Sequence, residues 1–414
     1  MPKRRVVITG MGVLAPNGNN LEQYWGALQG GVSGIDKITH FDTTDHTVKI
    51  AGEVTGLKAE EILDRREIRK LDRFTVYGLI AAEEAIKASG LLESTTDMER
   101  VGVIIGSGIG GIVTFEEQHE ILRNRGPRRV SPFFIPKMIA NIAGGHVAIK
   151  WGFKGPNHTV VSACASGTDG LGEAYRAIQY GDADVMISGG TEASVCQMAV
   201  AGFANMKALS TRNDDPPAAS RPFDLDRDGF VIAEGAGILV LEELEHARAR
   251  GATILAEMGG YGATDDAFHV TQPAAGGEGA ARAMSNAIRD GGLEPADIDY
   301  INAHGTSTPY NDKNESAAIR QVFGEHADKL LVSSTKSMTG HLLGAAGGIE
   351  AIATVLALKN GLVPPTINYT TPDPECDLDF VPNEARKAPI NAALSNTLGF
   401  GGHNAVILLK RWSD

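Results

Sequence analysis

The chain has 414 residues, of which 43% are hydrophobic and 21% charged, a balance typical of globular proteins that bury a sizeable core. The net charge of −13 excludes a general nucleic-acid binder, and no run of 18 apolar residues lacks a charge or a breaker, so we expect no membrane span. Fifty glycines exceed the usual share of about 7%, yet glycine and proline together are too few for a disordered or collagen-like chain. We expect the glycines at tight turns and close backbone contacts.

The predicted elements alternate between short apolar strands and helical patterns. The expected strands are Arg5–Thr9, Val101–Ile105, Thr159–Ser162, Val185–Ser188, Gly237–Glu242, Tyr300–Asn302, Leu331–Ser333 and Ala405–Leu409. The expected helices are Phe74–Ser89, Gly167–Tyr180, Gly279–Asp290, Asn314–Phe323 and Ala345–Lys359. This alternation is typical of an α/β fold with parallel strands buried under helices on both faces.

The N-terminal sequence MPKRRVVITGMGVLAP imitates a signal peptide. Its apolar run is short, contains two glycines and lacks an Ala-x-Ala cleavage site, so a first strand ending in a glycine turn is the better interpretation. The three cysteines, Cys164, Cys196 and Cys376, are too sparse for a disulfide scaffold and indicate a reducing compartment. We therefore expect a cytoplasmic protein.

A faint internal repeat is visible in the order of the elements. The strands before Cys164 and at Leu331–Ser333 each lead through small residues into a helix, and Arg100–Gly106 and Asp299–Gly305 each run from a strand into a glycine. Duplication of one half would explain these similarities. The alternative is that α/β proteins reuse such units in general.

Two motifs carry a weak signal for a bound ligand. Gly106–Gly111 matches G-x-G-x-x-G after a strand, but no acidic residue follows about 20 residues later to bind a ribose, which favours close packing over an NAD site. Asp224–Gly229 resembles the start of a calcium loop. Because its twelfth position is Gly235 and Arg227 lies inside it, we interpret it as a structural turn.

The context of Cys164 indicates a nucleophile. It ends an expected strand and precedes three small residues and a helix, whose dipole and free N–H groups should lower the thiol pKa. Such a strand–turn–helix corner also exposes a side chain, as a nucleophile elbow does. Cys196 and Cys376 lack this context, and we expect them in packing and loop positions.

His304 and His341 stand at expected strand-to-loop exits, each beside glycine and small hydroxyl residues that leave room for a ligand. Together with Cys164 they could bind a metal ion. The missing fourth ligand favours nucleophilic catalysis instead.

The motifs around these three residues resemble a known family. VVSACASGT around Cys164, NAHGTSTPYND around His304, KSMTGHLLGAAG from Lys336 to Gly347, SRPFDLDRDGFVIAEGA and the closing GFGGHN are similar to the β-ketoacyl-acyl-carrier-protein synthases, and among them to the chain-elongating type II enzymes. The resemblance covers essentially the whole chain. It implies a homodimer with a thiolase-like, five-layered αβαβα fold of two similar halves, residues 1–250 with the cysteine and residues 251–414 with the histidines.

The implied activity is a decarboxylative condensation in fatty acid elongation, in which an acyl group held on Cys164 reacts with malonyl-acyl-carrier protein to give 3-oxoacyl-acyl-carrier protein and CO2. The backbone N–H groups of Cys164 and Phe400 would form an oxyanion hole. His304 and His341 would donate N–H groups to the malonyl thioester oxygen. A supporting ion pair is implied between Lys336 and Glu350.

The resemblance assigns further residues by role. A mobile aromatic gate is expected at Gly399, Phe400, Gly401 and Gly402. Substrate contacts are expected from Thr306 and Thr308 to the phosphopantetheine arm, from Ile109, Phe134 and Phe203 along the acyl tunnel with Phe134 reaching across the dimer, and from His269 and Thr271. The chain departs from the family at Leu398, where an aromatic residue is common, and at His403, where threonine is common.

No cofactor is expected to be required, although a monovalent-cation site of some relatives matches Asn302, Glu350, Ser395 and Asn396. An acidic carrier protein requires a basic mouth on this acidic chain. The candidate docking residues are Arg65, Arg66, Arg69, Lys70, Arg128, Arg129, Lys207 and Arg212.

Other functions fit the sequence less well. A ketosynthase of a related polyketide pathway shares the motifs. A degradative thiolase needs a second cysteine near the C-terminus, which the stretch Asn396–Asn404 lacks. A catalytically silent subunit would have lost Cys164, and a nicotinamide dehydrogenase rests only on the weak glycine motif.

Overall fold

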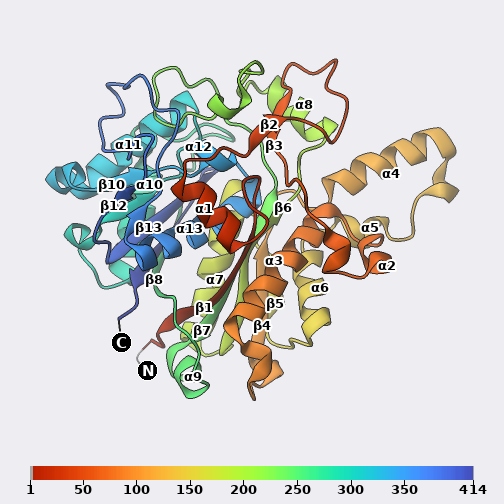
Figure 1. Cartoon of the computed structure of the whole chain (residues 1–414), viewed down its shortest axis with the longest axis horizontal. Coiled ribbons are helices and arrows are strands. Elements are labelled where there is room, and N and C mark those ends of the chain that lie inside the picture. Colours follow the sequence, from red (N-terminus) through yellow and green to blue (C-terminus); the bar gives the residue numbers. More distant parts are fainter. Residues whose placement is uncertain (1–2, 414) are drawn as a thin grey trace.

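The computed structural model describes residues 3–413 (Figure 1). Its centre is a ten-stranded mixed sheet with the strand order β10-β9-β13-β14-β8-β1-β7-β6-β4-β5. These strands are β1 (Val6–Leu14), β4 (Val101–Gly106), β5 (Asn157–His158), β6 (Val185–Glu192), β7 (Gly235–Glu243), β8 (Ala256–Asp265), β9 (Tyr300–Asn302), β10 (Leu331–Ser333), β13 (Ala392–Gly399) and β14 (His403–Arg411). Two small sheets pair β2 (Ile35–Lys37) with β3 (Ile50–Gly52) and β11 (Leu362–Val363) with β12 (Arg386–Lys387).

The ten strands form two groups of five with the same topology. Numbered within its own group, each runs in the order 3-2-4-5-1: β5-β4-β6-β7-β1 and β10-β9-β13-β14-β8. β4 in the first group and β9 in the second are each parallel to both neighbouring strands. The other neighbouring pairs are antiparallel, including β1 with β8 where the two groups meet. The expected two similar halves are confirmed. The expected parallel strands are present around β4 and β9, whereas the pairs nearer the junction are antiparallel, and the division at residue 250 stays a prediction.

Helices build layers on and between the two groups of strands. α3 and α6 pack outside the first group and α10 outside the second, with α11 beside it. α7 and α13 contact each other and strands of both groups, which gives the layer order αβαβα (Figure 1). The helices are α1 (Leu21–Gln29), α2 (Arg65–Ile68), α3 (Arg73–Ser89), α4 (Ile112–Arg125), α5 (Phe134–Met138), α6 (Ile142–Trp151), α7 (Ser166–Tyr180), α8 (Gln197–Asn205), α9 (Leu244–Ala249), α10 (Glu278–Asp290), α11 (Pro309–Phe323), α12 (Lys336–Thr339) and α13 (Ala346–Asn360). Among the helices of residues 3–413, none is long and apolar enough to cross a membrane.

The first strand does not end at its glycines as expected. β1 continues through Gly10 and Gly12 because α3 lies directly against it. A Cβ atom at Gly10 would lie 2.2 Å from the carbonyl oxygen of Ala85 on that helix. Glycine here permits close packing of a helix on a strand rather than a turn.

The expected strand Thr159–Ser162 is also wrong. Only Asn157 and His158 pair with β4, as β5, and the chain then leaves the sheet to form the turn that carries Cys164. The strands β8 and β13 were not expected, because both are rich in glycine and other small residues and lack the β-branched pattern of a strand.

Candidate active site

A cavity of about 310 Å³ is lined by residues of both halves. Of the residues predicted from the sequence, it brings together Cys164, Phe203, Lys207, Thr271, His304, Thr306, Thr308, His341, Gly399, Phe400 and Gly402. Sequence reasoning missed several lining residues, among them Met206, Asp228, Phe230, Asp266, Tyr310 and Leu343. Asp228, Phe230, Tyr310 and Leu343 lie within the motifs quoted above, but nothing in the sequence shows that their side chains face the cavity, and Met206 and Asp266 lie outside those motifs.

Cys164 lies in a single 3-10 turn, Ala163–Ala165, that leads directly into α7. Ala163 has a φ of +50°, a left-handed conformation that is uncommon outside glycine and marks a sharp corner. The Ser166 hydroxyl donates to the Ala163 carbonyl at 2.6 Å and accepts from the Ser162 N–H at 3.0 Å, which fixes the corner. The expected helix after Cys164 is therefore present, although the strand before it is not.

The protonation state of Cys164 differs from the sequence prediction. Burial raises the pKa of the thiol to about 11, and the charge of Lys336 and the backbone N–H groups of Phe400 and Cys164 only partly oppose this rise. The expected lowering of the pKa is wrong, because desolvation outweighs the helix terminus. The thiol is protonated at neutral pH. Both N–H groups act on the sulfur from close by, so they are available for the carbonyl oxygen of a thioester that Cys164 attacks.

The two histidine rings meet edge to face, with centroids 5.2 Å apart and planes at 85°. His304 follows β9, and its backbone N–H donates to the Glu315 carboxylate of α11 at 2.8 Å. His341 follows the short helix α12 rather than a strand, so that part of the prediction is wrong. Its N–H donates to the Val231 carbonyl at 2.7 Å.

Both histidines are neutral. Burial, with the positive charge of Lys336, lowers the pKa of His304 and of His341 well below the ordinary value of 6.5. Within residues 3–413, neither ring nitrogen of His341 has a hydrogen-bond partner, and Nδ1 of His304 also has none. Neutral imidazoles with free nitrogens can each donate one N–H to a bound ligand.

Lys336 and Glu350 form a buried ion pair, and their side chains are only 2% and 1% exposed. Burial raises the pKa of Glu350 to about 7, and the adjacent ammonium group opposes this rise. The pair does not line the cavity. Its lysine acts on Cys164 and the histidines through its charge.

Aromatic rings and a glycine loop close the cavity. The ring centroids of Phe400 and Phe203 are 6.4 Å apart, and those of Phe203 and Phe230 are 5.4 Å apart. The Phe230 ring in turn packs edge to face on the His341 ring, with centroids 5.3 Å apart. Gly399 packs on the nucleophile turn, since a Cβ there would lie 2.8 Å from the Ser162 carbonyl oxygen.

Three predicted substrate contacts lie elsewhere. Ile109, Phe134 and His269 are not among the cavity's lining residues, although all three lie within the described part of the chain. Ile109 is partly exposed in the loop after β4, Phe134 begins α5, and His269 is exposed. The hydroxyls of Thr306 and Thr308, by contrast, lie 2.9 Å apart in the wall of the cavity.

The G-x-G-x-x-G loop surrounds an internal carboxyl group, that of Glu192, whose pKa burial raises to about 7 although the surrounding N–H groups oppose the rise. The buried carboxylate of Glu192, the last residue of β6, accepts N–H groups from Gly108 at 2.7 Å and from Ile109 and Gly110 at 3.3 Å each. It also accepts from Gly344 at 3.1 Å, in the loop after His341. The protein's own carboxylate occupies the cradle that a pyrophosphate would need, so the interpretation as packing is correct. Sequence reasoning missed Glu192, which no motif marks.

The predicted docking residues are spread over α2 and its end, the turn Pro127–Arg129, and the segment after α8. Among the described residues, Arg65, Arg69, Arg128 and Lys207 make no ion pair. Arg212 pairs with Asp228 at 3.9 Å and donates to the Asp226 carbonyl at 2.7 Å. Its charge is therefore partly neutralised inside the molecule.

Comparisons with known proteins agree with this geometry. The model of the β-ketoacyl synthase N-terminal domain matches residues 3–247, and that of the C-terminal domain matches residues 255–370. The chain is 57% identical over 409 residues to 3-oxoacyl-[acyl-carrier-protein] synthase 2 of Staphylococcus aureus (strain COL), with 99% of both chains covered. It is 53% identical over 412 residues to the protein of the same name from Synechocystis sp., with 100% of this chain and 99% of that one covered. A solved structure of a type II PKS acyl-carrier protein in complex with its ketosynthase bound to the hexaketide matches at 39% identity with a TM-score of 0.91, over 99% of this chain and 100% of that chain.

Proposed function

The chain belongs to the β-ketoacyl synthase family of acyltransferases, and we propose that Cys164, His304 and His341 carry out its decarboxylative condensation. The substrates are an acyl-acyl-carrier protein and malonyl-acyl-carrier protein, and the products are 3-oxoacyl-acyl-carrier protein and CO2, in cytoplasmic fatty acid elongation. The observation that carries this proposal is the convergence of the three side chains, with two backbone N–H groups, on one cavity.

In the first half-reaction Cys164 attacks the thioester carbonyl of the acyl-carrier protein. The N–H groups of Cys164 and Phe400 stabilise the oxyanion of the tetrahedral intermediate, and losing one such donor costs about 10²–10³ in rate. Because the thiol is protonated at rest, its proton leaves during the attack and is taken up by the departing pantetheine sulfur. A neutral histidine in the cavity wall can relay that proton.

In the second half-reaction malonyl-carrier protein loses CO2, and its enolate attacks the acyl group on Cys164. Negative charge develops on the malonyl thioester oxygen, where His304 and His341 each donate an N–H. Neutral imidazoles suit this role because they donate without themselves losing a proton. Collapse of the tetrahedral intermediate releases the Cys164 sulfur, which regains a proton from solvent.

Separate assays of the two half-reactions test these roles. Single alanine variants of His304 and His341 should still form the acyl-enzyme, observed as a mass increase on Cys164, because the remaining histidine can relay the thiol proton, but each should release labelled CO2 from malonyl-carrier protein at least about 10²-fold more slowly. If both variants decarboxylated at the wild-type rate, the histidines would have another role.

A degradative thiolase is less well supported. The remaining cysteines do not line the cavity, and Cys376 is buried in a separate cluster with Phe223 and Phe380. Within the described residues, Cys164 is therefore the cysteine at the site.

For the carrier protein, we propose a docking surface of the eight basic residues named above. Lys207 supports it, because this exposed lysine lines the mouth of the cavity itself. The structural relative in complex with an acyl-carrier protein supports the same kind of partner.

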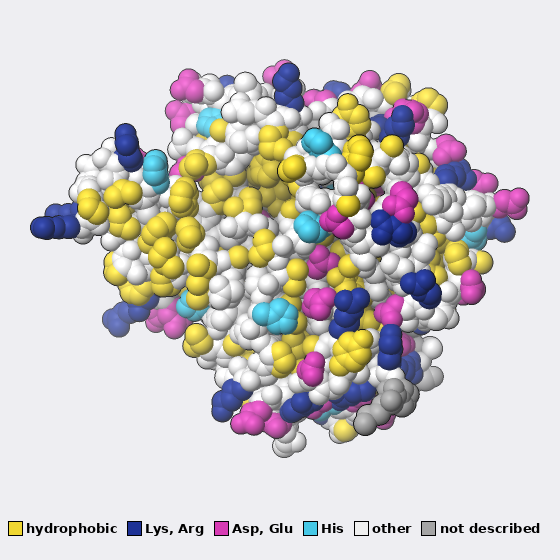
Figure 2. Space-filling model, turned by 180° about the vertical axis from the view of Figure 1, so that it is seen from behind, with side chains coloured by type: hydrophobic (Ala, Val, Ile, Leu, Met, Phe, Trp, Pro, Cys, Tyr) yellow, Lys and Arg dark blue, Asp and Glu magenta, His cyan; other side chains and the backbone are white. Residues whose placement is uncertain are grey.

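A homodimer is proposed from an exposed apolar surface. Phe115 and Leu122 of α4, Phe133, and Ile135 of α5 are all more than a third exposed, and Figure 2 shows hydrophobic side chains gathered over this lobe. Phe134 lies in the same lobe, so its predicted role in the acyl tunnel depends on the second copy. Light scattering should give twice the mass of the chain, and an Ile135→Asp/Phe133→Asp variant should shift toward the monomer. A wild-type monomer at micromolar concentration would contradict the proposal.

A structural monovalent cation fits the residues predicted for it. Among residues 3–413, several polar side-chain atoms at this place are buried without a hydrogen-bond partner. They are the amide oxygen and nitrogen of Asn302, the Ser395 hydroxyl, one Glu350 carboxylate oxygen and the Asn396 amide oxygen. Asn302 and Ser395 are register partners on β9 and β13. Oxygen ligands of this kind suit a hard cation, which would stabilise the fold beside Lys336–Glu350. The melting temperature should be higher in potassium chloride than in choline chloride at equal ionic strength, and Ser395→Ala should reduce that difference.

A further inference from the structure

One conspicuous sequence motif contributes lining residues such as Phe230 to the cavity but no reacting group. It is SRPFDLDRDGFVIA, residues 220–233, which belongs to the first half but runs along the loops of the second half that carry the histidines. Its backbone meets the segment after His304, since the Arg221 N–H donates to the Ser307 hydroxyl at 2.9 Å and the Gly229 N–H to the Ser307 carbonyl at 3.0 Å. It also meets the loop of His341, whose carbonyl accepts the Ala233 N–H at 2.9 Å.

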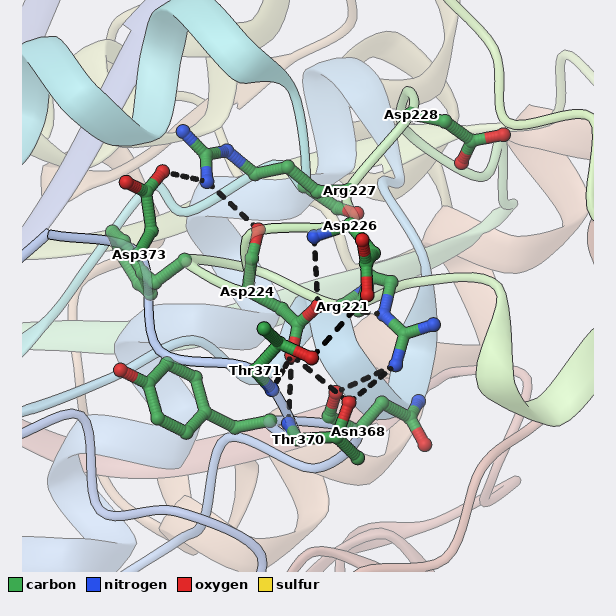
Figure 3. A network of polar contacts seen from close by, with 12 residues as sticks. Arg221, Asp224, Asp226, Arg227, Asp228, Asn368, Thr370, Thr371 and Asp373 are labelled. Carbon is green, nitrogen blue, oxygen red and sulfur yellow. Dashed lines mark hydrogen bonds and ion pairs between the residues drawn. The ribbon is translucent and has the colours of Figure 1, made fainter. Parts of the chain in front are cut away.

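The acidic side chains of this segment do not form a calcium loop. In Figure 3, Asp224 accepts N–H groups of Thr370 and Thr371 at 2.6 and 2.7 Å, whereas Asp228 points away from the cluster. Within residues 3–413, no group of three or more histidines, cysteines or acids is arranged to hold a metal ion. The interpretation of this motif as a structural turn is therefore correct.

Arg227 occupies the centre of the turn and is almost fully buried, with its side chain 4% exposed. Its guanidinium donates to the Asp373 carboxylate at 2.6 Å and to the Asp224 carbonyl at 2.8 Å (Figure 3). The same group donates to the carbonyl oxygens of Thr308 at 3.2 Å and Pro309 at 3.1 Å. A single side chain thus fixes the backbone on both sides of the Thr308–Pro309 peptide bond.

Asp312 completes this arrangement from α11. It lies 3.6 Å from the Arg227 guanidinium and is itself fully buried. Its carboxylate accepts the N–H of Thr306 at 3.0 Å and that of Phe223 at 2.8 Å. Arg227 and Asp312 together therefore determine where the hydroxyls of Thr306 and Thr308 stand in the cavity wall.

We propose that Arg227 is a positioning residue, which sets the hydroxyls of Thr306 and Thr308 at the place where the pantetheine arm of the substrate binds. The inference rests on the proposed function, which assigns those hydroxyls to the arm. Arg227 acts through the Thr308–Pro309 backbone and touches no substrate. Lysine cannot replace it, because a single ammonium group cannot reproduce a planar fork that bonds carbonyls in several directions while pairing with carboxylates.

The test compares a thioester that has the arm with one that lacks it. Octanoyl-pantetheine carries the amides that the hydroxyls would bond, whereas octanoyl ethyl thioester presents only the reacting group. Acylation of Cys164 is followed by intact mass. Arg227→Lys should lower kcat/KM for octanoyl-pantetheine about tenfold, the worth of one or two misplaced hydrogen bonds, and change that for the ethyl thioester less than about twofold.

Two comparisons separate positioning from general damage to the fold. Arg320→Lys alters a similar arginine, which pairs with Asp328 and Asp377 on the surface. It should leave kcat/KM unchanged for both thioesters. In a Thr306→Val/Thr308→Val background, Arg227→Lys should have no further effect on octanoyl-pantetheine, because the groups it positions are gone. If Arg227→Lys fails to fold, Asp373→Asn can replace it, because it removes the charge that pairs with the Arg227 guanidinium. That variant should show the same selective loss of kcat/KM for octanoyl-pantetheine.

Equal losses with both thioesters, no loss with either, or an undiminished effect in the Thr306→Val/Thr308→Val background would each overturn the inference. Wild-type protein that accepts neither thioester nor acyl-carrier protein would instead refute the proposed function, and the inference with it. Wild-type acylation with equal losses in the variant overturns the inference alone.

Discussion

Replacing Lys336 by methionine should separate two contributions of the Lys336–Glu350 pair, to stability and to reactivity. Both side chains are at most 2% exposed, so the single variant leaves the Glu350 carboxyl group buried without its partner, and that group must either carry an unpaired charge or take up a proton, because Lys336 opposes the rise of its pKa. Breaking a buried pair in this way costs about 3–5 kcal/mol, a large part of a typical folding free energy. The expected result is a clear fall in the urea midpoint of Lys336→Met.

In choline chloride, where the proposed cation site stays empty in both proteins, the double variant Lys336→Met/Glu350→Leu should recover that stability, because apolar side chains of similar volume often replace a buried ion pair at no cost. It should not recover reactivity. The charge of Lys336 opposes the effect of burial on Cys164, so the thiol pKa in the double variant should rise above its value of about 11. Each unit of rise removes about 90% of the thiolate at a fixed pH.

The assay pairs urea unfolding with the rate of Cys164 alkylation by iodoacetamide across pH 7–10. We expect the double variant to unfold like the wild type but to react more slowly throughout the range below its thiol pKa. A single variant as stable as the wild type would refute the assignment of a buried charge pair. A double variant that is alkylated at the wild-type rate would refute the electrostatic role of Lys336.

Three further predictions concern packing, protonation and docking. Gly10→Ala should destabilise the fold by about 1–3 kcal/mol, because its Cβ would lie 2.2 Å from a carbonyl oxygen of α3, whereas Gly26→Ala, with nothing within 4 Å in α1, should stabilise it by about 0.5–1 kcal/mol. His341 is neutral in the fold but protonates in the unfolded chain below its ordinary pKa of 6.5, so the wild type should lose about 1.4 kcal/mol per pH unit below that value relative to His341→Asn. Glutamate at Arg65, Arg69, Arg128 and Lys207 together should weaken carrier-protein binding and its salt dependence while leaving the melting temperature unchanged.

Each of these outcomes can fail in a specific way. Equal melting temperatures for Gly10→Ala and wild type would mean that β1 and α3 are not in the close contact described. A stability difference between wild type and His341→Asn that stays constant between pH 7.5 and 5.5 would mean that the histidine has the same pKa in the fold as in the unfolded chain. Unchanged carrier-protein affinity after charge reversal would place the docking surface elsewhere.

The sequence predicts the fold best where an element has a simple pattern. The strands at Tyr300–Asn302 and Leu331–Ser333 agree with the structure to the residue. Four of the five expected helices agree to within one residue at either end, whereas α11 begins at Pro309, more than a turn before the expected start at Asn314. β8 and β13 could not be predicted in the same way, because their glycines and small residues serve contacts with helices in other layers. Such contacts are tertiary and leave no local pattern.

At the site too, features set by neighbouring residues in the sequence could be predicted, and features set by tertiary contacts could not. Local motifs around Cys164, His304 and His341 predicted that these residues act together, and the structure brings them to one cavity. The error about the thiol pKa arose because burial depends on what the second half of the chain places over Cys164, which the residues next to it in sequence do not reveal. Phe230 and Glu192 escaped notice for a similar reason, since their roles depend on partners far along the chain.

Intact mass after incubation with acyl-acyl-carrier protein tests the central claim most directly, because the account places the whole first half-reaction on one sulfur atom. Wild-type protein should gain the mass of one acyl group per chain, and Cys164→Ala should gain none while keeping the wild-type melting temperature. A folded Cys164→Ala variant that still acquires the acyl group would contradict the account.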